Sequence, residues 1–282
     1  MNTNILTDYF LPLSLFIIMF GMGMSLIVDD FKRVVLFPKA VILGLVGQIL
    51  LLPLIAFVLI KGLALEPMIA IGVMLIAACP GGSSSNLISH LAKGDTALSI
   101  SITAISSLIT VITIPLIVGL SMEYFLVADQ PIHLPVIKTI TALIIITLLP
   151  VSLGMFVRYK FTQFAINQES KINVFSGLFL AFLVIAILLQ QIENVKAGIV
   201  STGLVVVSLN VSSMIIGFVI AKFFKLNSSQ STTIGIEVGI QNGTLAILIA
   251  TTILHQSEMA IPAAIYSLTM FISGGFVILL RR

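Results

Sequence analysis

One acidic side chain in the middle of an apolar run is the residue of this sequence best placed to do chemistry. Glu237 lies at the centre of Thr233–Thr244, whereas the other ten acids fall at the ends of apolar runs or between them. A carboxylate at the centre of a bilayer costs at least about 2.5–3.5 kcal/mol unless it is paired. No Lys or Arg lies mid-run. The counter-charge must therefore be a proton, a partner in a water-filled cavity or a bound cation, unless a protonated Glu237 merely joins two helices.

The neighbours of Glu237 favour a cation. Glycines recur at every fourth position over residues 235–243, and the amides Gln241 and Asn242 follow the acid. Such glycines allow close helix packing, but they also allow the backbone to unwind beside a cavity and to expose its carbonyls. Carboxylate, amide and carbonyl oxygens together suit a hard cation such as Na⁺. The scattered histidines and the single cysteine, Cys79, favour no transition-metal site.

A second interruption lies at Cys79–Asn86. Pro80 removes a helical hydrogen-bond donor, and Gly81 and Gly82 relax the chain. Ser83–Asn86 would then begin a half-helix whose free amides point into the membrane, as is typical of an anion or ligand site. The simpler interpretation is a proline kink in which the serines bond to their own helix.

Composition identifies the elements that must position these groups. The chain has 282 residues, of which 59% are hydrophobic and 9% charged, whereas a soluble domain is about 25% charged. This excludes a soluble enzyme, a disordered protein and a nucleic-acid binder, and it predicts an all-α polytopic membrane protein in a lipid bilayer. Nine apolar segments are long enough to span one. They are Tyr9–Val28, Pro38–Ile60, Pro67–Leu91, Thr96–Val127, Leu134–Val157, Ile172–Ile192, Ala197–Ala221, Gln230–Leu254 and Ala260–Leu280.

The basic residues predict the orientation of these spans. Eleven of the fourteen fall on one side when the connections alternate, and only Lys61, Lys138 and Lys196 fall on the other. Because cytoplasmic loops are enriched in Lys and Arg, we expect the N-terminus outside and the C-terminus in the cytoplasm. The expected location is a bacterial inner (plasma) membrane.

The two interrupted spans, the third and the eighth, run in opposite directions. Paired broken helices are typical of inverted-repeat transporters, whose binding site lies where the helices cross. Spans 1–4 would match spans 6–9, leaving span 5 unpaired. Three further polar side chains could join this centre: Ser99 and Thr103, which share one helical face, and Gln48 in the middle of the second span.

At these positions the sequence resembles the bile acid:sodium symporters, in the nine-span form of the apical sodium-dependent bile acid transporter. The resemblance covers nearly the whole chain and rests on Phe20–Ser25, Cys79–Asn86, Lys93–Ser99 and Glu237–Asn242. It implies one transporter unit, residues 1–282, made of a panel and a core. The panel would hold spans 1, 5 and 6 (about 9–28, 134–157 and 172–192), and the core spans 2–4 and 7–9 (about 38–127 and 197–280).

The resemblance also implies two co-transported Na⁺ ions and a substrate near the crossing. The first Na⁺ site would be formed by Ser85, Asn86, Ser99, Thr103 and Glu237. The second would be formed by Gln48, Glu237, Gln241 and the carbonyls of Val238 and Ile240. The substrate would contact Ser83, Ser84, Asn242 and Phe271.

One departure concerns the last span. Some bacterial relatives carry a His-Asn pair facing the substrate cavity where this chain has Met270 and Phe271. These two residues and Met74 are candidates for an apolar cavity wall that would admit a bulky ligand, although Met is also ordinary core filling.

The expected function is Na⁺-coupled import of an organic anion by alternating access. The anion would be bile acid-like or a small carboxylate such as pantoate or a 2-keto acid. A proton-coupled carrier using Glu237 and, less favoured, a channel stay open as alternatives. We expect no enzymatic activity, because the chain has no H-E-x-x-H motif and no loop large enough for a catalytic domain. Nothing indicates a nucleic-acid partner or an obligate protein partner.

Overall fold

The computed structural model describes residues 11–126 and 136–281, and leaves undescribed the side chains of residues 33–35, 169–170, 173 and 194–199. All elements of this described part are helical. The α-helices are α1 Leu11–Ser25, α2 Val28–Leu36, α3 Pro38–Val46, α4 Leu52–Leu63, α5 Pro67–Ala78, α6 Ser83–Leu91, α7 Thr96–Phe125, α8 Val136–Leu143, α9 Leu149–Lys160, α10 Thr162–Gln190, α11 Ile192–Phe223, α12 Ser228–Gly239, α13 Gly243–Leu248 and α14 Ala260–Arg281. Three short π-helical turns interrupt or extend these helices: η2 Gly47–Leu51 joins α3 to α4, η3 Ile144–Leu148 joins α8 to α9, and η4 Ile249–Ile253 extends α13. A 3₁₀ turn, η5 Ser257–Met259, precedes α14.

The helices form a polytopic bundle of membrane-spanning length. Among the described residues, six apolar helical segments are long enough to cross a bilayer. The number rises to seven if the bent pair α5 and α6 is counted as one span. Two shorter apolar helices, Leu11–Ser25 and Val174–Gln190, lie where the first and sixth spans are expected. The number of nine spans and the inverted repeat therefore stay predictions, while the polytopic all-helical class is confirmed.

The two expected interruptions lie side by side in the centre of the bundle. Cys79–Gly82 separates α5 from α6, whose axes bend by 62°. Residues 240–242 separate α12 from α13, which continue as one apolar span, Ser228–Ile253, whose residues 231–251 are buried by other helices. The amide of Asn242 donates to the carbonyl of Pro80 at 2.8 Å, so the two unwound segments are directly bonded.

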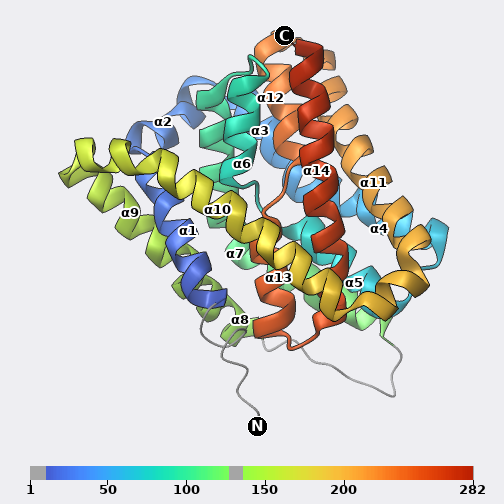
Figure 1. Ribbon diagram of the computed structural model, residues 1–282. Helices are drawn as coiled ribbons and strands as arrows, with labels where there is room; N and C mark the ends of the chain where they lie inside the picture. Colours follow the sequence, from blue (N-terminus) through green and yellow to red (C-terminus); the bar gives the residue numbers. More distant parts are fainter. Residues whose placement is uncertain (1–10, 127–135, 282) are drawn as a thin grey trace.

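The remaining helices surround this centre. On one side α1 packs against α9 and α10, and α10 crosses the front of the molecule obliquely (Figure 1). On the other side α11 packs against α12 and α14, and α7 packs against α5 and α6 (Figure 1). Where α1 meets α9, Gly23 and Gly154 each lie against the backbone of the other helix, so neither position has room for a side chain.

Helix boundaries differ from the expected spans in several places. Val28–Leu36, expected to lie in a connection, forms the separate helix α2, whose Lys32 pairs with Asp29 at 2.7 Å. Helix α10 begins at Thr162, ten residues before the expected span, because the polar segment ahead of the apolar run is also helical. Of the residues used to predict topology, Arg282 lies outside the described residues, and the side chains of Arg33 and Lys196 are not described.

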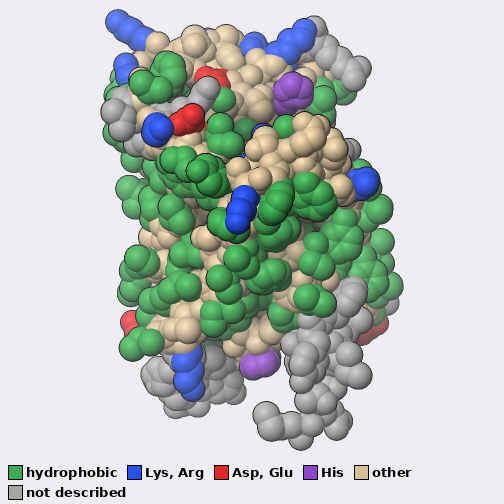
Figure 2. Space-filling view, turned by 90° about the vertical axis from the view of Figure 1, so that its left-hand side faces the viewer, with side chains coloured by type: hydrophobic (Ala, Val, Ile, Leu, Met, Phe, Trp, Pro, Cys, Tyr) green, Lys and Arg blue, Asp and Glu red, His purple; other side chains and the backbone are tan. Residues whose placement is uncertain are grey.

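Charge is concentrated at one end of the bundle. Figure 2 shows hydrophobic side chains over the middle of one face, and Lys and Arg mostly toward the end where Figure 1 places the C-terminus. This distribution agrees with an integral membrane protein. The orientation of the termini relative to the membrane stays a prediction.

Candidate functional site

Glu237 of α12 is fully buried and accepts hydrogen bonds from two side chains of α7. Ser99 donates to Oε1, and Thr103 donates to Oε2 at 2.8 Å. These hydroxyls share one helical face because they are four residues apart. Asn86 of α6 completes the group, since Ser99 also approaches its Oδ1 at 2.8 Å and Thr103 approaches it at 3.4 Å. Thr103 also lies 3.4 Å from Ser85. The five residues expected at the first Na⁺ site are thus brought together.

This cluster contains more acceptor contacts than hydrogens. The two hydroxyls of Ser99 and Thr103 each carry one hydrogen, yet each approaches both Asn86 Oδ1 and a Glu237 oxygen. The hydroxyl of Ser85 donates instead to the carbonyl of Gly82 at 2.8 Å. A group of converging oxygen atoms with too few hydrogens to bond one another is suited to coordinate a hard cation.

Gly81 leaves the space beside Glu237 open. A Cβ at this position would lie 2.9 Å from Glu237 Oε2, 3.2 Å from Thr103 Oγ1 and 3.4 Å from Gln48 Nε2. The same point therefore touches residues of both expected Na⁺ sites. Since no glycine of the described chain has a positive φ, the glycine serves here for space rather than for an unusual backbone conformation.

The second expected site forms around Gln48 and Gln241. Gln48 lies in the π-helical turn η2, 1% exposed, and its Nε2 donates to Gln241 Oε1 at 3.2 Å. Gln241 in turn donates to the carbonyl of Val238 at 2.9 Å and approaches that of Glu237 at 3.4 Å. Among the described residues Gln48 Oε1 is buried without a hydrogen-bond partner. An unpaired buried acceptor is costly, so this atom is a candidate cation ligand.

The glycines around Glu237 serve both expected purposes. Gly235 and Gly239 pack against Met214 of α11, and Gly243 packs against Ser267 of α14, which accounts for them by close packing. The chain nevertheless leaves the helix directly after Gly239 and enters the next at Gly243. Packing and unwinding therefore coexist, and the glycine spacing alone does not separate them.

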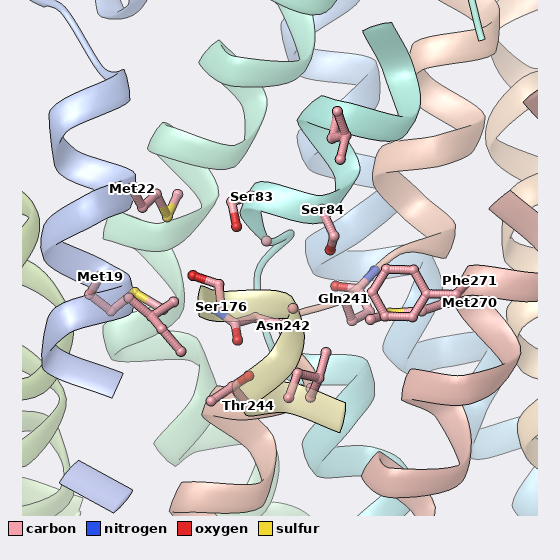
Figure 3. A pocket seen from close by; sticks show the side chains of 16 residues that line it. Met19, Met22, Ser83, Ser84, Ser176, Gln241, Asn242, Thr244, Met270 and Phe271 are labelled. Atoms are coloured by element: carbon pink, nitrogen blue, oxygen red, sulfur yellow. The ribbon is translucent and has the colours of Figure 1, made fainter. Parts of the chain in front are cut away.

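A cavity of about 120 Å³ opens beside the crossing. Figure 3 shows Ser83, Ser84 and Asn242 around it, with Ser176 of α10 opposite and Met19, Met22, Met270 and Phe271 on its apolar sides. All four residues expected at the substrate site line this cavity, as does Gln241. Met74 does not; it is packed in the hydrophobic core. In the described part of the chain no charged side chain lines the cavity.

Asn242 has a structural role as well. Its side chain accepts from the amide of Leu245 at 3.0 Å and so caps α13. Its Oδ1 is therefore occupied, and its amide group is the part left for a ligand.

Several lining or supporting residues were not expected from the sequence, Met19 and Met22 of the cavity wall among them. The sequence did not indicate a site role for Gly81, because a glycine beside Pro80 is explained by a proline kink. It did not indicate one for Ser176 either, because a serine in a membrane helix usually bonds to its own helix, as Ser176 does at 2.8 Å. Asn210 and Tyr266 donate to the carbonyl of Gly239. Asn210 could have been found by the reasoning applied to Gln48, since it is a lone amide in the middle of an apolar span.

The ligand chemistry is that of oxygen alone. Among the described residues, no group of three or more His, Cys, Asp or Glu side chains could hold a metal ion. A site of one carboxylate, hydroxyls, amides and carbonyls fits an alkali cation better than a transition metal.

Comparisons with known proteins agree with this chemistry. The family described as the sodium bile acid symporter family matches residues 12–198. The chain is 34% identical over 271 residues to the uncharacterized sodium-dependent transporter YocS of Bacillus subtilis, covering 95% of this chain and 81% of that protein. It is 30% identical to the probable sodium/metabolite cotransporter BASS1 of Arabidopsis thaliana, covering 96% of this chain and 66% of that protein. It is also 30% identical to the human sodium/bile acid cotransporter 4, covering 86% of this chain and 55% of that protein.

These relatives are named as transporters, and none of the names describes an enzyme. The expectations of a transporter and of no enzymatic activity are confirmed at the level of the family. The chain spans about two thirds or less of the chloroplast and human relatives, so what those longer proteins carry does not transfer directly.

Proposed function

The chain belongs to the sodium bile acid symporter family, and from this premise we propose that it imports a small organic anion together with two Na⁺ ions by alternating access. The observation that carries the proposal is the fully buried Glu237, beside which the hydroxyls of Ser99 and Thr103 each have one hydrogen for two acceptors, a Glu237 oxygen and Asn86 Oδ1. A cation supplies the missing positive charge.

Glu237 would be shared by both ions. The first ion would be held by Ser85, Asn86, Ser99 and Thr103 with one carboxylate oxygen, and the convergence of these side-chain oxygens supports this. The second would be held by the amide oxygens of Gln48 and Gln241 and the carbonyls of Val238 and Ile240 with Glu237. The unpartnered Gln48 Oε1 supports this second set.

The cavity favours a small carboxylate over a bile acid-like substrate. Its volume of about 120 Å³ is below the roughly 300–1,000 Å³ of pockets that hold drug-sized ligands. The carboxylate would be met by the Asn242 amide, the Ser83 and Ser84 hydroxyls and the free amides at the start of α6. The short apolar part would lie against Met270 and Phe271. This keeps pantoate and 2-keto acids as candidates and disfavours a steroid.

Alternating access needs two bodies that move against each other. We assign α1, α8, α9 and α10 to a panel and the remaining helices, with both broken spans, to a core. The cavity supports this division, because Met19 and Met22 of α1 and Ser176 of α10 face Ser83, Ser84 and Asn242 of the broken spans across it (Figure 3). A rocking panel would expose the cavity alternately to the two sides of a plasma membrane, with the basic C-terminal end in the cytoplasm.

The coupling is energetically sufficient. A tenfold Na⁺ gradient supplies about 1.4 kcal/mol per ion. Two Na⁺ with one monoanion carry a net charge of +1, which adds about 2.3 kcal/mol per 100 mV. Together these give roughly 5 kcal/mol, enough for several-thousand-fold accumulation.

The test is a thermal-stability screen of the purified protein over carboxylates, in NaCl and in choline chloride. A ligand that binds only the folded state raises its stability, so a carboxylate that stabilises only with Na⁺ would identify substrate and coupling ion together. Uptake of that carboxylate into proteoliposomes should then require a Na⁺ gradient. Full Na⁺-dependent uptake by Glu237→Gln would refute the ion assignment, and uptake driven by a proton gradient in choline would favour the proton-coupled alternative.

A further inference from the structure

The carbonyl of Gly239, the last residue of α12, accepts hydrogen bonds from side chains of two different helices. Asn210 Nδ2 of α11 donates to it at 2.7 Å, and the hydroxyl of Tyr266 of α14 donates at 2.8 Å. Both side chains are 0% exposed. Neither belongs to the residues proposed to touch an ion or the substrate.

This carbonyl is one of those that the end of α12 leaves without a backbone donor. In an uninterrupted helix it would accept from the amide of Gly243, but that amide donates to the carbonyl of Gln241 at 3.0 Å instead. A buried carbonyl needs one partner within a membrane. Two donors, which come from the neighbouring helices α11 and α14, do more than satisfy it, because they also fix the direction in which the peptide group points.

Asn210 carries a feature that packing alone does not explain. Among the described residues its Oδ1 is buried without a hydrogen-bond partner. An unpaired buried amide oxygen lowers stability, and an apolar side chain of similar size would avoid that cost. The part of Asn210 with a defined contact is the Nδ2 that holds Gly239.

The direction of this peptide group sets that of its neighbours. Ile240 has an extended backbone (φ −114°, ψ 115°), in which successive residues face opposite sides of the chain. With the Gly239 carbonyl held toward α11 and α14, this extended conformation leads us to expect the Ile240 carbonyl on the opposite side of the chain. On the preceding side, Val238 is fixed by Gln241, which bonds Gln48.

We propose that Asn210 and Tyr266 are positioning residues that hold the unwound segment so that its carbonyls face the second Na⁺. The inference rests on the proposed function. The two side chains set the affinity for that ion without touching it, and they leave the first ion's hydroxyl and amide ligands unchanged.

The experiment uses Na⁺ alone as the probe, so it needs no identified substrate. The full-length purified protein is titrated with NaCl at constant ionic strength, with choline chloride as the balancing salt, and its thermal stability gives the apparent Na⁺ affinity. Tyr266→Phe removes only the hydroxyl, and Asn210→Ala removes the other donor. The matched control is Tyr124→Phe, because Tyr124 is exposed and its hydroxyl accepts a hydrogen bond from Lys61 at 2.9 Å, far from Gly239 in the sequence.

We expect each single substitution to weaken the apparent Na⁺ affinity by about fivefold to tenfold, the effect of one lost hydrogen bond, and Tyr124→Phe to match the wild type. The double variant should lose more than the product of the two, because the carbonyl then has no donor. Reduced stability in choline with an unchanged Na⁺ affinity would overturn the inference while leaving the symporter intact. A wild-type protein with no response to Na⁺ would overturn both.

Discussion

Replacing Gly81 by alanine adds one methyl group at the point where both proposed ion sites meet. The new Cβ would lie 2.9 Å from Glu237 Oε2 and 3.2 Å from Thr103 Oγ1. Both distances are shorter than ordinary van der Waals contact, and both neighbours belong to the proposed first Na⁺ site. Gly81 has no positive φ, so the backbone itself tolerates alanine and any loss of Na⁺ binding arises from the filled space.

The magnitude follows from what must move. The carboxylate has to give way by a few tenths of an ångström, and overpacking of this kind costs typically about 1–3 kcal/mol. With Na⁺ bound the ion competes for the same space, so we expect most of this cost to appear as lost affinity. Taking 1.4 kcal/mol per factor of ten, the Na⁺ affinity should fall by about fivefold or more.

Gly82 offers a matched control one residue away. A Cβ there would lie 3.5 Å from Ser84 Oγ and 3.8 Å or more from Asn242, which are ordinary contacts. Thermal stability is measured for Gly81→Ala, Gly82→Ala and the wild type over a NaCl titration balanced with choline chloride. Gly82→Ala should keep the wild-type Na⁺ response. Equal Na⁺ affinities for Gly81→Ala and Gly82→Ala would refute the placement of the ions around Glu237.

Three further predictions test the separate parts of the site. At Na⁺ concentrations near 100 times the dissociation constant, each bound ion stabilises the fold by about 2.7 kcal/mol. Ser99→Ala and Gln48→Leu should therefore each remove about half of the Na⁺-dependent stabilisation, whereas Glu237→Gln should remove all of it. Equal losses of stabilisation in the three variants would contradict a carboxylate shared by both ions. Phe271→Asn should shift preference by about tenfold toward carboxylates that carry a hydroxyl, measured as ligand-dependent thermal stability in NaCl, and an unchanged ranking would remove Phe271 from the substrate site. In a Cys79→Ala background, a membrane-impermeant thiol reagent should label Ala64→Cys only from outside and Lys225→Cys only from inside; labelling of both from one side would contradict the proposed topology.

The expected spans and the observed helices begin at the same residue at Pro38, Pro67 and Thr96. Thr96 begins α7 as expected, because Asp95 caps it by accepting from the amide of Leu98 at 3.0 Å. The extension of α10 back to Thr162 was not predictable from hydrophobicity, since a polar helix outside the apolar run leaves no apolar signal. The π-helical turn at Gly47–Leu51 was equally hidden, because the residues in it are as apolar as those of a regular helix apart from Gln48.

Some residues of the candidate site could be predicted from charge and spacing in the sequence, whereas others could be found only from the three-dimensional structure. Glu237 stood out because an unpaired acid in a bilayer is expensive, and that argument needs only the sequence. Ser99 and Thr103 were placed by helical spacing, and Asn86 and Ser85 by the resemblance to known symporters. The role of Gly81 depends on three helices meeting at one point, and the roles of Asn210 and Tyr266 depend on a carbonyl that only the unwound backbone exposes. These contacts join residues far apart in the sequence, so no local sequence pattern predicts them.

In the proposed mechanism, Gln241 would be the physical link between the second Na⁺ ion and the substrate. Its side chain accepts from Gln48 and donates to the carbonyl of Val238, within the proposed second Na⁺ site, and the same residue lines the cavity (Figure 3). Its neighbour Asn242 bonds Pro80 of the other broken span through its backbone amide. An ion that draws the Gln48 and Gln241 oxygens inward therefore also sets the cavity wall that the substrate meets. Because coupling between two binding sites is reciprocal, the factor by which Na⁺ raises substrate affinity must equal the factor by which substrate raises Na⁺ affinity, and Gln241 is where that coupling free energy would arise.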